Sequence, residues 1–344
     1  MYKKFVILSL VLVYLVVIAG AVVRMTGSGM GCPDWPKCFG YIIPPTQESE
    51  LIFKPDHAYF EGQVIINEES LQVAKIAFTS TEKFENSNWE PYTKHDYAIF
   101  NPWHTWIEYI NRLLGALAGV AVFIMAILSF RKWKQSKRIT LLSWLAVFMM
   151  GFQGWLGATV VYSVLAPVRI TLHMIVALLI VLLLIYLLYL MRKKRTLFVF
   201  DSTFKWGMIF AMILTLVQIA LGTQVRQHVD EQVDIVGYSA KSLWLKHPEI
   251  TFYIHRSFSI IVFVLNLFLF YRNRKKRLGH PLMNWIIALI ATEVFTGILM
   301  YYFDFPFLTQ PLHLVIASIL FGLQSYVLLT SLKEKPNTAL AEEA

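Results

Sequence analysis

Long apolar segments alternate with polar connections along the whole chain. Eight segments are long and apolar enough for a bilayer, because a spanning helix needs about 20 apolar residues. We expect helices at residues 5–23, 104–130, 139–162, 170–191, 204–225, 250–271, 282–303 and 311–332. The pattern predicts an all-α membrane protein, since a β-barrel would require short alternating segments.

The first apolar segment has two interpretations. A cleaved signal peptide would end near Ala19-Gly20-Ala21, whose small residues resemble a cleavage site. The apolar run is longer than a usual signal core, and its end resembles the end of the fifth segment. These two features favour a retained transmembrane helix.

Basic clusters give the chain an orientation. They follow the second, fourth and sixth segments, at residues 131–138, 192–195 and 272–277. By the positive-inside rule, both termini lie in the cytoplasm, and the connections 25–103 and 226–249 lie outside. The polar tail, 333–344, is expected to be disordered.

Composition agrees with a membrane protein. The 344-residue chain is 57% hydrophobic and 15% charged, whereas soluble domains are about 25% charged. The net charge of +9 comes from short basic connections. It therefore gives no indication of a nucleic-acid partner.

The connection after the first segment contains the only two cysteines, Cys32 and Cys38. On the oxidising side of a membrane, a disulfide is the default expectation, and an electron-exchanging thiol pair is the alternative. Residues from about 40 to 100 carry many acids and short β-like runs, which predict a small structured insert.

The chain repeats itself. The matched positions are Arg24 with Arg226, Asn111 with His255, Arg112 with Arg256, and His173 with His313. We therefore expect two halves, 1–201 and 202–344, with the insert in the first. Because each half has four spans, the halves should be tandem four-helix bundles related by a pseudo-twofold axis along the membrane normal.

The second apolar segment opens with a polar stripe. Helical periodicity places His104, Glu108, Asn111, Gly115 and Gly119 on one face. A carboxylate at the bilayer centre costs about 2.5–3.5 kcal/mol on insertion scales. The second half has Phe252 where the first has Glu108, which indicates chemistry in the first half only. The alternative is a salt bridge between Glu108 and Arg112.

Histidines recur near the outer ends of the helices. His173, His255 and His313 at matched depths favour haem held between imidazoles. Zinc would more often require three or four close ligands, and a cap or interface role is the ordinary alternative for a single histidine. Arginines at the same level are candidates for haem propionates, with interfacial snorkelling as the alternative: Arg24, Arg112, Arg226, Arg256 and Arg169.

These motifs together resemble the haem A synthase family. The resemblance covers all eight segments and rests on the residues 24–38, on Glu108-Tyr-Ile-Asn-Arg112 and on the histidines. It implies a haem-dependent oxidoreductase of a bacterial inner membrane that oxidises the C8 methyl of haem O to the formyl of haem A. It further implies haem b between His255 and His313, and substrate haem beside Glu108 and His173.

Partners implied by the resemblance are an electron donor or acceptor, haem O synthase, cytochrome oxidase assembly factors and a second copy of the chain.

One position departs from the family, whose pattern is Glu-x-x-His-Arg, because this chain has Asn111. Three explanations stay open: His173 is the sole ligand, His104 about 10 Å along the helix replaces the missing imidazole, or the first half has lost catalysis. An electron-transfer cytochrome b and a haem transporter or chaperone are the alternative functions.

Overall fold

The computed structural model describes residues 1–192 and 198–332. Its long helices are α1 Tyr2–Met25, α2 Pro102–Ser129, α3 Lys137–Tyr162, α4 Pro167–Leu190, α5 Ser202–Val236, α6 Ile250–Lys275, α7 Met283–Tyr302 and α8 Thr309–Ser331. All eight are long and apolar enough to span a membrane, which confirms the predicted all-α membrane class. Part of the predicted basic cluster 192–195 and the predicted tail 333–344 lie outside the described residues.

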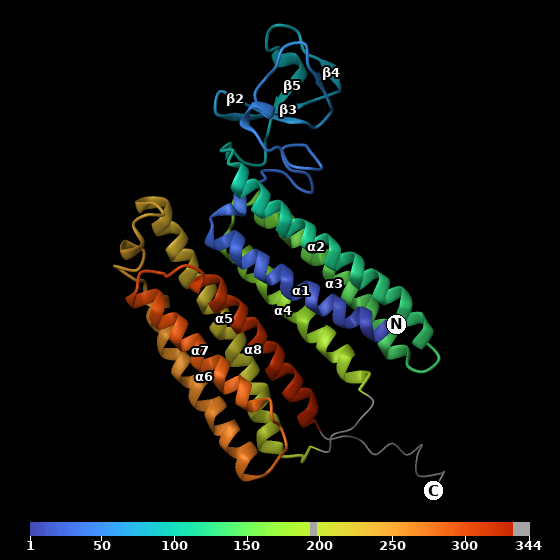
Figure 1. Ribbon diagram of the computed structural model, residues 1–344, viewed down its shortest axis with the longest axis vertical. Helices are drawn as coiled ribbons and strands as arrows, with labels where there is room; N and C mark the ends of the chain where they lie inside the picture. Colours follow the sequence, from blue (N-terminus) through green and yellow to red (C-terminus); the bar gives the residue numbers. More distant parts are fainter. Residues whose placement is uncertain (193–197, 333–344) are drawn as a thin grey trace. The chain divides into compact units, whose positions relative to one another are not determined.

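The chain forms two compact units, Met1–Leu184 with Phe307–Val315, and Ile185–Pro306 with Ile316–Ala344. In the first, α1 packs along α2, and α2 along α3 (Figure 1). Tyr2 shares a 2.6 Å hydrogen bond with Ser143, which joins the start of α1 to the first turns of α3. Hence α1 and α3 begin at the same end of this unit.

Five short strands occur in the insert between α1 and α2. They are β1 Ala58–Tyr59, β2 Val64–Asn67, β3 Ser70–Ala74, β4 Phe78–Thr79 and β5 Trp89–Pro91. They form two antiparallel sheets, one of β1 and β4 and one in the order β2-β3-β5. Tyr59 and Trp89 are buried between them, with ring centroids 4.9 Å apart. Figure 1 places these strands beyond the first turn of α2.

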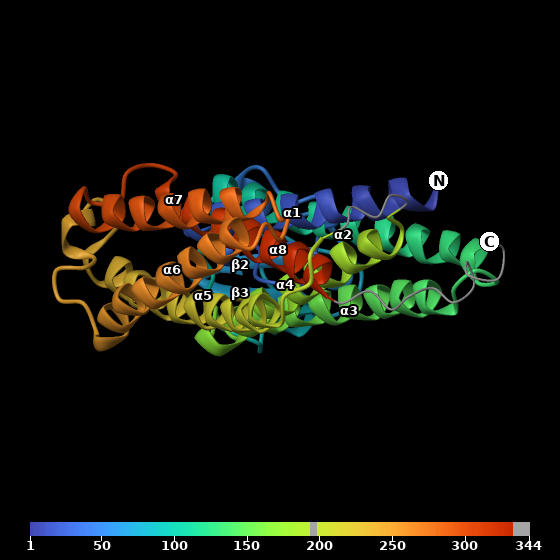
Figure 2. The ribbon, with the colours of Figure 1, turned by 90° about the horizontal axis from the view of Figure 1, so that it is seen from below.

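In the second unit, α5 packs against α6, and α6 against α7 (Figure 2). Asp201 caps α5 by accepting a hydrogen bond from the Phe204 amide at 2.7 Å. The same carboxylate pairs with Arg272 of α6 at 2.8 Å. The hydrogen bond from Arg272 holds the pKa of Asp201 below its ordinary value. This cap therefore also ties the start of α5 to the end of α6.

The expected end of α5 at residue 225 is wrong, because the helix continues to Val236. Beyond the membrane span, Val229 and Val233 keep the helical spacing of apolar residues. Both are buried against Trp244 and Phe305. At 1.5 Å per residue, the 35-residue helix is about 52 Å long, whereas the hydrocarbon core is about 30 Å thick.

His280 occupies the turn between α6 and α7. It is 2% exposed and stacks against Phe198 and Phe204, with ring centroids 4.5 and 4.9 Å away. The Asn273 side chain donates to the His280 carbonyl at 2.9 Å and accepts from its amide at 3.1 Å. Burial lowers the pKa of His280 to about 4. The ring is therefore neutral at pH 7.

His280 should make the protein less stable in mild acid. Its folded pKa lies below the unfolded value of about 6.5, so its contribution is fully present above pH 6.5. The contribution is lost as the pH falls toward 4. We expect a loss of about 1–2 kcal/mol between pH 7 and 5, allowing for solvent screening. Thermal unfolding of detergent-solubilised protein should show this loss, and His280→Phe should reduce it. An equal pH dependence in wild type and His280→Phe would contradict the assignment, and the exposed His247→Ala is the control.

Candidate functional site

Glu108 lies on α2 and is 4% exposed. Its Oε2 accepts a hydrogen bond from the backbone amide of Cys32 at 2.8 Å. Its Oε1 accepts from Nε of Arg112, one turn further along α2, at 3.1 Å, and also from Nη2. The salt bridge considered in the sequence analysis is therefore present, and it compensates the charge of a buried carboxylate.

Arg112 also binds backbone carbonyls of the loop between the cysteines, in addition to Glu108. Its Nη1 donates to the carbonyl oxygens of Asp34 at 2.6 Å and Lys37 at 2.9 Å. Its Nη2 donates to the carbonyl oxygen of Cys32 at 3.0 Å. One guanidinium thus fixes three points of the loop between the cysteines onto α2. We call this arrangement of Glu108, Arg112 and residues 32–38 the loop clamp.

The cysteines form a disulfide, as predicted, and both are buried, at 0% and 1% exposure. The insert covers them, because Phe39, Leu51 and Val64 pack in the same apolar cluster. Thiol–disulfide exchange requires access to a sulfur atom. The burial therefore favours the structural interpretation of the pair over the electron-exchanging one.

The start of α2 also contacts the residue before Cys32. A Cβ on Gly31 would collide with the backbone carbonyl of His104, so only glycine fits this approach. The Thr105 hydroxyl donates to the Gly31 carbonyl at 2.7 Å. His104 is half-buried in the first turn of α2. Whether its ring can replace an iron ligand stays a prediction.

Asn111 and His255 occupy similar places within their own units. A Cβ on Gly20 of α1 would lie 3.8 Å from Oδ1 of Asn111. A Cβ on Gly222 of α5 would lie 3.1 Å from Cε1 of His255. Each side chain thus packs against a glycine of the preceding helix, at positions that the repeat matches. The wider pseudo-symmetry and the boundary at residues 201–202 stay predictions.

His173 has a comparable environment on α4. A Cβ on Gly157 of α3 would lie 3.4 Å from its ring. The Gln153 side chain donates to the His173 carbonyl at 2.9 Å, as Gln218 does to the His255 carbonyl at 3.0 Å. The sequence analysis missed both glutamines. A glutamine followed four residues later by glycine, in α3 and in α5, was the available pattern.

The first unit has features that fit a flat, bulky ligand. A Cβ on Gly115, Gly119 or Gly154 would meet no atom within 4 Å, so space lies beside these positions. Within residues 1–192 and 198–332, Nδ1 of His173 and Oδ1 of Asn111 are buried without a hydrogen-bond partner. A buried imidazole nitrogen without a hydrogen-bond partner is compatible with haem ligation.

The other predicted residues are dispersed. Arg226 pairs with Asp230 at 2.8 Å. Arg256 is exposed and lies over the rings of Phe252 and Tyr253, 5.8 and 5.5 Å from their centroids. Arg24 is half-buried in the last turn of α1, and Arg169 donates to the Thr159 carbonyl at 2.7 Å. His313 is half-buried near the start of α8.

A family model described as "cytochrome oxidase assembly protein" matches residues 3–81 and 55–325. The chain belongs to this family. The two matches overlap at residues 55–81, inside the insert.

Three similar curated proteins are each named heme A synthase. The protein of Shewanella oneidensis is 29% identical over 49% of this chain, but the match spans only 39% of that relative. The protein of Alkalihalophilus pseudofirmus is 24% identical over 95% of this chain and 97% of its own. That of Wolbachia pipientis is 22% identical over 92% of this chain and 89% of its own.

The loop clamp should protect the disulfide. Arg112→Gln removes the charged hydrogen bonds to the loop, each of which contributes about 1.5–3 kcal/mol. We expect reduction by a phosphine to be at least about tenfold faster, because 1.4 kcal/mol corresponds to a factor of ten. Maleimide labelling of the released thiols measures the rate. Arg256→Gln, at the matched but exposed position, is the control. Equal rates in the two variants would show that Arg112 does not hold the loop.

Proposed function

We propose that the chain is a haem A synthase that oxidises the C8 methyl group of haem O to the formyl group of haem A. The observation that carries this proposal is the first unit's combination of a buried His173 nitrogen without a hydrogen-bond partner among the described residues and a buried glutamate on α2. The match to the assembly family over residues 3–81 and 55–325, together with the names of the similar proteins, supports it.

In this proposal, the second half carries the resident cofactor, haem b, with His255 and His313 as its iron ligands. The packing of His255 against Gly222, and the hydrogen bond from Gln218 to its backbone carbonyl, support this role because they fix the position of the residue. Arg226 and Arg256 are the candidates for its propionates. A bound haem supplies one-electron transfer and oxygen chemistry.

The first half binds haem O as substrate. His173 is the proposed iron ligand, and the open space beside Gly115, one turn from Asn111 on α2, leaves room for the ring. Glu108 acts as the acid or base near the methyl carbon, where it accepts or returns a proton. The Cys32 amide and the Arg112 guanidinium orient its carboxylate. The insert and the disulfide loop exclude water from that end of the site.

The protein works in the bacterial inner membrane, with both termini in the cytoplasm and the disulfide loop outside. This orientation rests on the basic clusters between the helices. Conversion of a methyl to a formyl group removes electrons from the carbon and adds an oxygen atom, so the reaction needs an oxygen source, and an electron donor or acceptor is the proposed redox partner. Haem O synthase and cytochrome oxidase assembly factors are the proposed neighbours, and a second copy of the chain is a further one.

A di-haem or mono-haem electron-transfer cytochrome b is the second candidate. Two observations favour it, namely the asparagine at position 111 and the engagement of Glu108 by Arg112. Both would be expected of a first half without substrate chemistry. A haem transporter or chaperone is a third possibility. A protein without a Soret absorption band, purified after expression with ample haem, would indicate that role.

Haem extracted from cells that supply haem O should separate these functions. With wild-type protein, we expect haem A or its hydroxylated intermediate, identified by mass. Glu108→Gln keeps the size of the side chain but removes its charge and its capacity to take up a proton, so it should bind haem but lose product by about 100-fold or more, the usual contribution of acid–base catalysis. His255→Ala should instead lose the low-spin haem spectrum.

Two results would contradict the proposal. If haem B were the sole pigment of the wild type, the synthase function would be excluded and electron transfer would be the remaining function. Full product formation by Glu108→Gln would remove the acid–base role, even if the wild type makes haem A.

A further inference from the structure

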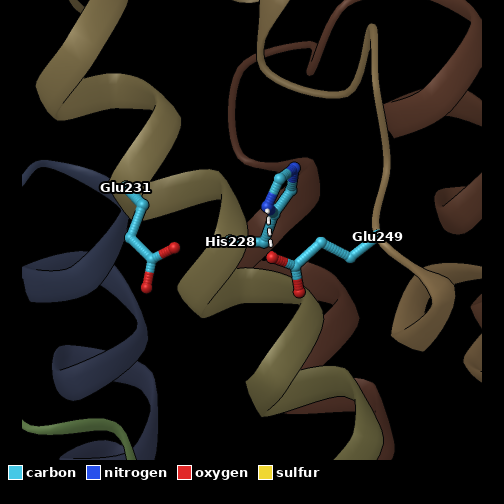
Figure 3. Close-up of side chains that lie close together, drawn as sticks. All are labelled: His228, Glu231 and Glu249. Carbon is cyan, nitrogen blue, oxygen red and sulfur yellow. Dashed lines mark ion pairs between the residues drawn. The ribbon is translucent and has the colours of Figure 1, made fainter.

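Three metal-binding side chains meet where α5 ends and α6 begins. His228 and Glu231 lie about one turn apart on α5, and Glu249 is the N-cap residue of α6. One ligand atom from each lies within 4.8 Å of the others. Figure 3 shows the Glu249 side chain extending from the start of α6 toward the His228 ring. This cluster lies outside the residues assigned above to haem.

The Glu249 side chain does not cap α6 but pairs with His228. A side chain at an N-cap usually accepts hydrogen bonds from the first amides of its helix, but Glu249 makes no such bond. Its Oε1 lies instead 3.6 Å from Nδ1 of His228. This separation is too long for a good hydrogen bond. It is close to the spacing of about 3.3 Å between two ligands of a tetrahedral zinc ion with 2.0–2.1 Å bonds.

The part of α5 that carries the cluster is held in place by apolar packing. It is the extension beyond residue 225, whose Val229 and Val233 are buried against Trp244 and Phe305. The His228 side chain is 11% exposed, whereas that of Glu249 is 61% exposed. Glu231 is also exposed. A fixed imidazole with two adjustable carboxylates can close around an ion that enters from solvent.

We propose that His228, Glu231 and Glu249 bind one divalent cation of the zinc class. One imidazole and two carboxylates suit a borderline metal ion, and the two negative charges balance its charge. A water molecule completes a tetrahedral shell. The ion fastens the extension of α5 to the first residue of α6 and so closes the connection 237–249. It thereby fixes the helix end that carries Arg226.

Zinc binding by the full-length protein tests the proposal. The protein in detergent, freed of any affinity tag and stripped with a chelator, is titrated with Zn²⁺ against a fluorescent zinc indicator. We expect one site in the wild type and at least tenfold weaker binding in His228→Ala and in Glu249→Gln. His247→Ala is the matched control, because His247 is an exposed histidine in the same connection. It should bind as the wild type does.

A second measurement guards against misfolding. Glu231→Gln changes an exposed side chain, so its thermal unfolding without zinc should match the wild type. Added Zn²⁺ should raise the unfolding temperature of the wild type and His247→Ala, but not that of Glu231→Gln. Zinc affinity equal to wild type in His228→Ala or in Glu231→Gln would overturn the site. So would the absence of a zinc site in the wild type. Neither readout depends on haem or on synthase activity.

Discussion

The contact between Arg112 and the disulfide loop is the constraint on which the first unit depends. A buried carboxylate in a membrane helix needs a compensating charge and hydrogen bonds. Arg112 supplies the charge, and the Cys32 amide supplies a further hydrogen bond. The same guanidinium binds the loop carbonyls, so the loop, the insert above it and the start of α2 are held together. The acid is thereby placed at one fixed position, on the same face of α2 as Gly115 and Gly119.

The two halves use one packing contact for different chemistry. In each, a polar side chain lies against a glycine of the preceding helix, Asn111 against Gly20 and His255 against Gly222. The second half has an imidazole at this point but Phe252 in place of Glu108. The first has the acid but no imidazole there. This division agrees with the proposed electron transfer in one half and the proposed methyl oxidation in the other, and it leaves His173 as the proposed iron ligand of the first half.

Hydropathy was sufficient to predict the helices, because the bilayer imposes a length and an apolar composition on each span. It failed at the end of α5, since Val229 and Val233 are buried by Trp244 of the α5–α6 connection and by Phe305, which follows α7, rather than by lipid. Such a contact is not local in sequence. The salt bridge of Glu108 with Arg112 could be anticipated from their one-turn spacing. The hydrogen bonds of Arg112 to loop carbonyls could not be anticipated. Every residue has a backbone carbonyl, so the sequence does not show which of them lie near Arg112.

A structure of the protein with haem O bound would test the central claim most directly. The account predicts haem O in the first unit with its iron bonded to His173 and its C8 methyl group facing Glu108. It also predicts that the Arg112 contacts to the loop are retained. Haem bound only at His255, with His173 and Glu108 unchanged, would contradict the account and would make the protein an electron-transfer cytochrome.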